Sequence, residues 1–170
     1  MTDTPGSITS GTCQLETDAI QRFFLRPIFL SCTIGIPFCV FKILFGVSMV
    51  RAGVSAGTYL SIFGMAVTTW AVADLMMNSG KSLLDLFHRQ APFEYCTIAQ
   101  IGRIAGMPLV FLGIDTLLTF TIICTMLWTG WIATLSPLES TLWYAATTMN
   151  LISLSLVSLY NEIRRRGRGI

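Results

Sequence analysis

Charged residues are scarce in this chain. Only 12% of its 170 residues are Asp, Glu, Lys or Arg, about half the share found in an average soluble domain. The mean hydropathy is correspondingly high, at +0.68. Together these values exclude a disordered chain, a basic nucleic-acid-binding module and an ordinary soluble enzyme domain. They predict a small polytopic membrane protein.

Histidine and paired cysteines are also scarce. The single histidine, His88, cannot ligate a haem from both sides or build a histidine-rich metal site. The five cysteines are scattered and form no C-x-x-C, so they do not outline a disulfide framework. A Gly-rich phosphate loop, a nucleophile elbow and an H-E-x-x-H motif are missing as well. We therefore expect no cofactor, no bound metal and no enzymatic activity.

Four apolar segments are long enough to cross a bilayer. A helix rises 1.5 Å per residue, so about 20 residues span roughly 30 Å of hydrocarbon. The segments lack the alternating pattern of transmembrane barrel strands. The predicted fold class is therefore all-α, with a four-helix transmembrane domain over residues 27–160. Its helices are expected at about 27–50, 57–77, 104–129 and 138–160.

Polar segments flank this predicted domain. Residues 1–26 form a polar N-terminal tail, in which 17–26 suit a short interfacial helix. The length and acidic residues of this tail do not fit a signal peptide. Residues 161–170 form a basic tail. We expect its arginines to contact anionic lipid headgroups rather than nucleic acid. These arginines are Arg164, Arg165, Arg166 and Arg168.

The positive charges are unevenly distributed between the two ends of the predicted helices. Nine of the eleven Lys and Arg residues fall at the end shared by both termini, and only Arg51 lies at the opposite end. Cytoplasmic loops carry an excess of Lys and Arg, so both termini are expected in the cytoplasm. The absence of an Arg/Ser-rich, acid-free presequence favours a bacterial inner membrane. A thylakoid or other organellar membrane is the alternative.

The connection between the second and third predicted helices is amphipathic. In residues 81–90, KSLLDLFHRQ, apolar side chains fall on one helical arc and charged ones on the other. We predict a separate amphipathic helix there, lying on the cytoplasmic membrane surface. The alternative is that the second transmembrane helix continues through this segment.

Prolines mark helix ends and distortions. Pro37 and Pro108 fall inside predicted spans and are expected to kink them. Ser136 and Glu139 flank Pro137 in a pattern typical of a helix start, with Ser as the cap and Glu as its reciprocal partner.

Ionisable residues inside the predicted spans need partners, because an unpaired charge in hydrocarbon is costly. Lys42 shares a helical stripe with the small residues Ser31, Gly35 and Gly46, which indicates a face turned toward protein. Lys42 and Asp115 lie at depths that agree to roughly 6 Å. We therefore predict an ion pair that joins the first and third helices. An ion or proton pathway with Asp115 as the carrier is the alternative.

A further acid, Asp74, lies one turn from the expected inner end of the second helix. We interpret it as an interfacial acid paired with Lys81 or Arg103. A catalytic pair of aspartates, as in an intramembrane hydrolase, would require Asp74 to meet Asp115. Their expected depths differ by about 10 Å or more, which argues against such a pair.

Small polar residues gather on one arc of the fourth predicted helix. Asn150 lies near the bilayer centre and should hydrogen-bond to another helix, because lipid offers it no partner. Ser153 lies on the same arc. We interpret both as helix-packing residues, and a polar lining for a substrate path is the alternative.

These patterns predict a small non-catalytic integral membrane subunit that stabilises, assembles or scaffolds a larger membrane protein complex. Its expected partners are the lipid bilayer and either other membrane subunits or further copies of itself. The alternative is a small transporter or ion-channel component that uses Lys42 and Asp115 in an intramembrane polar site.

Overall fold

The computed structural model describes residue 29, residues 31–87 and residues 92–167, with only the backbone for 161 and 163–167. Every element in this part of the chain is helical, as the predicted all-α class requires. The elements are η1 (Ser31–Gly35, a π-helical turn), α3 (Ile36–Ala56), α4 (Thr58–Leu86), α5 (Thr97–Ile104), α6 (Pro108–Trp128), η2 (Trp131–Thr134, a 3₁₀ turn) and α7 (Pro137–Gly167).

Four helical segments are long and apolar enough to cross a membrane, which indicates an integral membrane protein. They are Ser31–Ala56, Thr58–Leu86, Pro108–Trp128 and Pro137–Tyr160. Each corresponds to one of the four predicted segments. The second differs most from its predicted length, because its helix runs on to Leu86 instead of ending near residue 77.

The two prolines expected to kink helices behave differently. Pro37 is the second residue of α3 and follows the π-helical turn η1 by one residue. The wider turn accommodates a residue that lacks an N–H and crowds the carbonyl four positions earlier. Pro108 does not kink a helix, contrary to our prediction. Gly106 adopts a φ of 74°, which turns the chain after α5, and Pro108 then starts α6.

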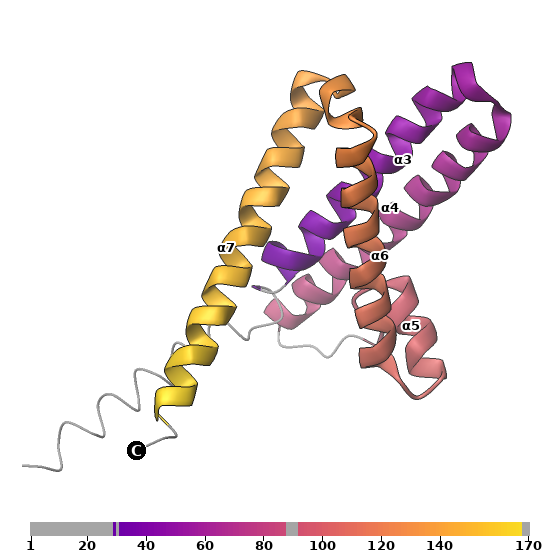
Figure 1. The fold of residues 1–170 in the computed structure, drawn as a ribbon. Coiled ribbons are helices and arrows are strands. Elements are labelled where there is room, and N and C mark those ends of the chain that lie inside the picture. Colours follow the sequence, from indigo (N-terminus) through magenta and orange to yellow (C-terminus); the bar gives the residue numbers. More distant parts are fainter. Residues whose placement is uncertain (1–28, 30, 88–91, 168–170) are drawn as a thin grey trace, which may run out of the picture.

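The helix α3 is the centre of the bundle. It forms an antiparallel hairpin with α4, while η2 joins α6 and α7 into a second hairpin (Figure 1). α3 also contacts α6 and α7. More than half of its apolar span (56%) is buried, against 22% for each of the other three spans. α6 and α7 meet at η2 and diverge toward their other ends (Figure 1).

The hairpin of α3 and α4 is close-packed along glycines. A Cβ on Gly64 would lie 2.7 Å from the Gly46 carbonyl oxygen, and a Cβ on Gly46 would lie 2.9 Å from the Gly64 oxygen. A side chain on Gly35 would overlap the Asn78 amide. The stripe of small residues that shares a face with Lys42 is therefore the surface that packs against α4.

Aromatic side chains fill the bundle near η2. The Phe41 ring packs edge-on against Trp143, with 4.8 Å between the ring centroids. Phe45 packs near Trp131 at 6.0 Å, and Met126 is fully buried beside them. At the same end, Arg51 and Glu139 form a bidentate ion pair of 2.8 and 2.6 Å between α3 and α7. These contacts tie α7 to the central helix.

The predicted start of the fourth helix is confirmed. The Ser136 backbone N–H donates to the Glu139 carboxylate at 2.8 Å, and the Glu139 N–H donates to the Ser136 hydroxyl at 3.4 Å. This reciprocal pair is a capping box, and Pro137 is the first helical residue.

The connection between the second and third spans differs from our prediction. Residues 81–86 do not begin a separate helix, because α4 continues through them without a break. The polar residues Asn78 and Ser82 are buried, and the Ser82 hydroxyl donates to the Asn78 carbonyl at 2.9 Å. Residues 88–91 lie outside the described part. A short helix does occur in this connection, but at α5.

The C-terminal basic segment also continues a helix, since α7 extends to Gly167. The side chains of Arg164, Arg165 and Arg166 and all of Arg168 lie outside the described residues. The N-terminal tail to residue 26 lies outside them as well. Lipid contacts of the arginines and a helix over 17–26 stay predictions.

Candidate functional site

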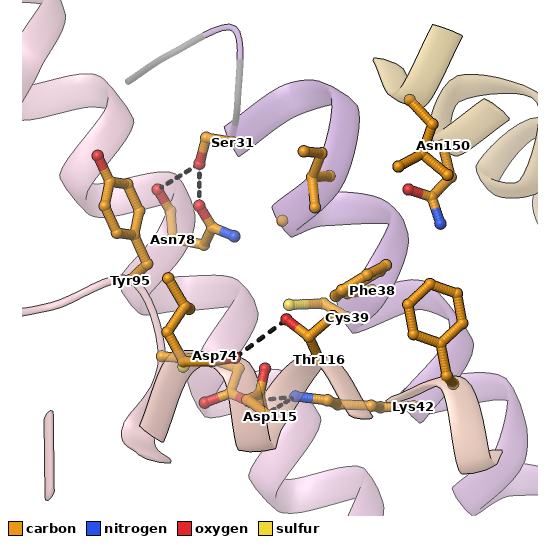
Figure 2. A pocket seen from close by; sticks show the side chains of 16 residues that line it. Ser31, Phe38, Cys39, Lys42, Asp74, Asn78, Tyr95, Asp115, Thr116 and Asn150 are labelled. Atoms are coloured by element: carbon orange, nitrogen blue, oxygen red, sulfur yellow. Dashed lines mark hydrogen bonds and ion pairs between the residues drawn. The ribbon is translucent and has the colours of Figure 1, made fainter. Parts of the chain in front are cut away.

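Three charged side chains from three helices meet inside the bundle. The Lys42 ammonium of α3 lies 2.9 Å from Asp74 Oδ2 of α4 and 2.6 Å from Asp115 Oδ1 of α6 (Figure 2). All three side chains are buried. We call Lys42, Asp74 and Asp115 the charged cluster. Each helix supplies one member, so the cluster joins α3, α4 and α6 electrostatically.

The contact between Lys42 and Asp115 is the one that their matching depths predicted. Asp74 was placed wrongly. It is a buried residue within α4 and pairs with Lys42, because α4 ends at Leu86 rather than just after Asp74. The depth argument against a meeting of Asp74 and Asp115 fails for the same reason.

The partners predicted for Asp74 are engaged elsewhere. The Lys81 ammonium pairs with Glu94 at 3.1 Å and lies over the Tyr95 ring. The Arg103 guanidinium donates to the Pro92 carbonyl at 2.6 Å. Both cations therefore fasten the connection between α4 and α6.

Asp74 is held firmly as an acceptor. Its Oδ1 accepts the Thr97 backbone N–H at 2.7 Å and the Thr97 hydroxyl at 2.6 Å, while Oδ2 accepts from Lys42. The Trp70 indole donates to the Thr97 hydroxyl at 2.7 Å, and its ring lies 4.4 Å from the Lys42 nitrogen. Both oxygens of Asp74 thus have charge-assisted partners.

Asp115 has fewer partners. Its Oδ1 accepts from Lys42, and the Cys96 side chain lies within hydrogen-bonding reach. Burial raises the pKa of the Cys96 thiol to about 11, so this thiol stays protonated near neutral pH and can donate. With two carboxylates and one ammonium, the charged cluster holds one more acid than base.

The charged cluster borders a cavity of about 370 Å³ (Figure 2). Its walls come from η1, α3, α4, the segment before α5, α6 and α7. Most of the wall is apolar, with Ile34, Phe38, Leu112, Phe120 and Leu154 contributing. Ser31 and Asn78, whose side chains hydrogen-bond to each other, also line it. Volume and lining are typical of small-molecule sites, which occupy about 300–1,000 Å³ and combine apolar walls with a few polar groups.

Asn150 faces this cavity from α7 (Figure 2). Only 8% of the residue is exposed, yet within the described residues its amide makes no hydrogen bond. The cross-helix hydrogen bond that we predicted for Asn150 is therefore wrong, because its side chain lines the cavity instead of meeting another helix. Ser153 does behave as a packing residue, since its hydroxyl is hydrogen-bonded to that of Thr33 at 3.1 Å.

Two residues of the site were missed in the sequence. Thr97 lies far from Asp74 in the chain, and no local pattern indicates that it holds this carboxylate. Trp70 lies one turn before Asp74 on the same face of α4, and this shared face was the available signal that Asp74 points inward. Across the described ranges, no group of three or more His, Cys, Asp or Glu side chains is arranged to hold a metal ion.

Comparisons with known proteins assign no family to the chain. No protein-family model matches it, and searches of curated proteins and of solved structures give no match.

Proposed function

We propose that the protein is a small transporter component whose intramembrane site is the cavity beside the charged cluster. One observation supports this function best: the buried charges face an open volume instead of packed side chains. An ion pair that only joins helices gains from being enclosed on all sides, because each remaining lone pair and proton needs a partner.

The proposal includes a topology and a location. Both termini lie in the cytoplasm, and the membrane is a bacterial inner membrane, with a thylakoid or other organellar membrane as the alternative. The arrangement of the described cations supports this orientation. Lys81 in the last turns of α4 and Arg103 in α5 lie at one end of the described bundle, whereas Arg51 lies at the end near η2, where Glu139 neutralises it.

Flux measurements in proteoliposomes test this function. The purified protein is reconstituted with a pH dye inside acid-loaded vesicles, and Na⁺, K⁺ or organic cations are added outside. Protein-dependent dissipation of the gradient by any of these ions, and its loss in Asp115→Asn, is the expected result. Thr148→Val is the matched control, because Thr148 is exposed and bonds only its own helix. Absence of flux with every ion would reject transport.

A non-catalytic membrane subunit is the second candidate function. The low burial of α4, α6 and α7, at 22% of each apolar span, leaves wide helix faces for partner subunits or further copies. Affinity purification in mild detergent tests it. Recovery as a monomer without co-purifying membrane proteins would contradict this role.

A further inference from the structure

We propose that the cavity exchanges one proton for one monovalent organic cation that has an apolar body, with Asp115 as the group that changes partner. This inference rests on the proposed function, because it names the substrate class and the coupling ion of the same site.

The charge balance of the cluster is the first step of the argument. Lys42 neutralises one carboxylate, and Asp74 is the one already fixed in its ionised form by Lys42 and by both donors of Thr97. The remaining carboxylate, Asp115, leaves a buried net charge of −1 whenever it is ionised. A buried charge needs a counter-charge, so the site holds either a proton or a cation.

The titratable groups around Asp115 come from every element packed against it. They are Lys42 and Cys39 on α3, Asp74 on α4, and Tyr95 and Cys96 before α5. Burial raises the pKa of Tyr95 above its usual range and that of Cys96 to about 11, so neither becomes an extra anion near neutral pH. Lys42 is the one cation among these groups.

Asn150 provides the second, independent indication of a ligand. It is more than nine-tenths buried, lines the cavity and has no hydrogen-bond partner in the described chain. Its amide is accessible from the cavity, and a ligand that carries a polar or charged head can give it the hydrogen-bond partner that the described chain does not. Asp115 lines the same cavity, so one ligand can contact both residues.

The walls favour an organic cation over an inorganic one. Phe38 and Phe120 form an edge-to-face pair, with 5.9 Å between ring centroids, on the cavity surface. Aromatic faces attract alkylammonium groups and exclude water. A small metal cation would need several oxygen ligands, which these apolar walls do not supply.

We place the entry of the cation on the side of the cavity formed by α6 and α7. Three lining residues there are also partly exposed, at 36% for Leu112, 41% for Phe120 and 50% for Leu154. They belong to α6 and α7, which meet at η2 and diverge toward their other ends (Figure 1). These residues therefore reach from the cavity to the outer surface of the described bundle, where the apolar body of the cation can enter.

The exchange balances in charge and atoms. Asp115 holds one proton in the empty state. When the cation enters, the Asp115 O–H bond breaks, the proton leaves to water and the carboxylate pairs with the cation. Reversal of these steps releases the cation. The charged cluster together with its bound proton or cation has a net charge of zero in both states, so neither state buries an unpaired anion.

Calorimetry in uncharged nanodiscs tests the exchange on the wild-type protein. Benzyltrimethylammonium is titrated at neutral pH in two buffers of different ionisation enthalpy, and neopentylbenzene serves as its neutral isostere. We expect about one proton released per bound cation and at least tenfold weaker binding of the isostere. Binding without proton release, equal binding of the two probes or no binding of the cation would each overturn the inference.

Two variants assign the exchange to residues. Asp115→Asn should abolish proton release and weaken cation binding at least tenfold, while Asn150→Leu should weaken binding several-fold and leave proton release intact. Thr148→Val is the control and should match the wild type. Unchanged proton release in Asp115→Asn would contradict the assignment.

The failures of this inference and of the proposed function are distinguishable. Flux driven by Na⁺ or K⁺ without benzyltrimethylammonium binding would keep transport and reject the organic cation. Proton-releasing cation binding without any flux would keep the exchange and reject transport.

Discussion

Neighbouring side chains of α3 lie in opposite surroundings. Phe41 and Phe45 pack against tryptophans in the apolar core. Lys42, which lies between them in the sequence, turns to a cavity wall beside two carboxylates. The aromatic face of α3 maximises contact, whereas its charged face keeps charge beside open space. The difference indicates that the aromatic face stabilises the bundle, while the charged face contributes less to packing.

Lys42→Met is expected to have the largest effect on the free energy of unfolding. It leaves the buried, ionised Asp74 without its cation, and we expect a loss of about 5 kcal/mol in unfolding free energy. Protonation would neutralise Asp74, so the loss should shrink as the pH falls. Denaturant unfolding in one detergent at several pH values measures it. Lys81→Met, which removes a partly exposed cation, is the control. A loss that does not depend on pH would contradict this reasoning.

Phe41→Ala tests how much the aromatic face of α3 stabilises the bundle. Phe41 is 1% exposed and contacts Trp143, so its removal opens a cavity. We expect a loss of about 3 kcal/mol, at the low end for such changes, because lipid solvates apolar groups in the unfolded chain. The same unfolding assay measures it, with the exposed Phe63→Ala as the control. Cation binding at the cavity should persist in Phe41→Ala.

Substitutions of the two acids of the cluster should change the free energy of unfolding by different amounts. Asp74→Asn weakens the hydrogen bonds from Thr97 and Lys42, and we expect a loss of about 1.5–3 kcal/mol. Asp115→Asn keeps the Lys42–Asp74 pair and replaces a protonated, neutral acid by a neutral amide of similar shape, so its effect should stay below about 1 kcal/mol. Equal losses would show that Asp74 is not the fixed partner of Lys42.

The smallest effect is expected at Arg51. Its side chain is 53% exposed, and its pair with Glu139 is screened by water at the bundle end. Arg51→Gln should cost about 0.2–1 kcal/mol in unfolding free energy. A loss as large as that of Lys42→Met would erase the distinction between exposed and buried charges.

The four long helices were predictable because the length of an apolar segment indicates whether it can cross a membrane. The pair of Lys42 and Asp115 followed from counting residues along two helices that run in the same direction. The same count failed for Asp74, because the polar residues Asn78 and Ser82 ended the apolar pattern while α4 continued past them. Buried polar contacts hold that extension, and hydropathy does not register them.

The cavity could not be predicted from the sequence. Its lining residues come from η1, α3, α4, the segment before α5, α6 and α7, so it depends on how elements far apart in the sequence are placed. Asn150 illustrates what the sequence does not determine. Its position on a polar arc of the fourth helix was evident, but whether its side chain meets another helix or a cavity depends on where the neighbouring helices lie.

The position of Lys42 in the chain has a consequence for how the protein is made. Synthesis delivers this lysine to the membrane before either aspartate, so the first helix alone would carry an uncompensated cation into hydrocarbon. Asp74 arrives with the next helix, and close contact between Gly46 and Gly64 lets the two insert as one hairpin. Asp115 follows as the surplus charge, and α7 encloses the cavity last. The order of the helices in the sequence thus brings Lys42 and Asp74 together before Asp115 is added.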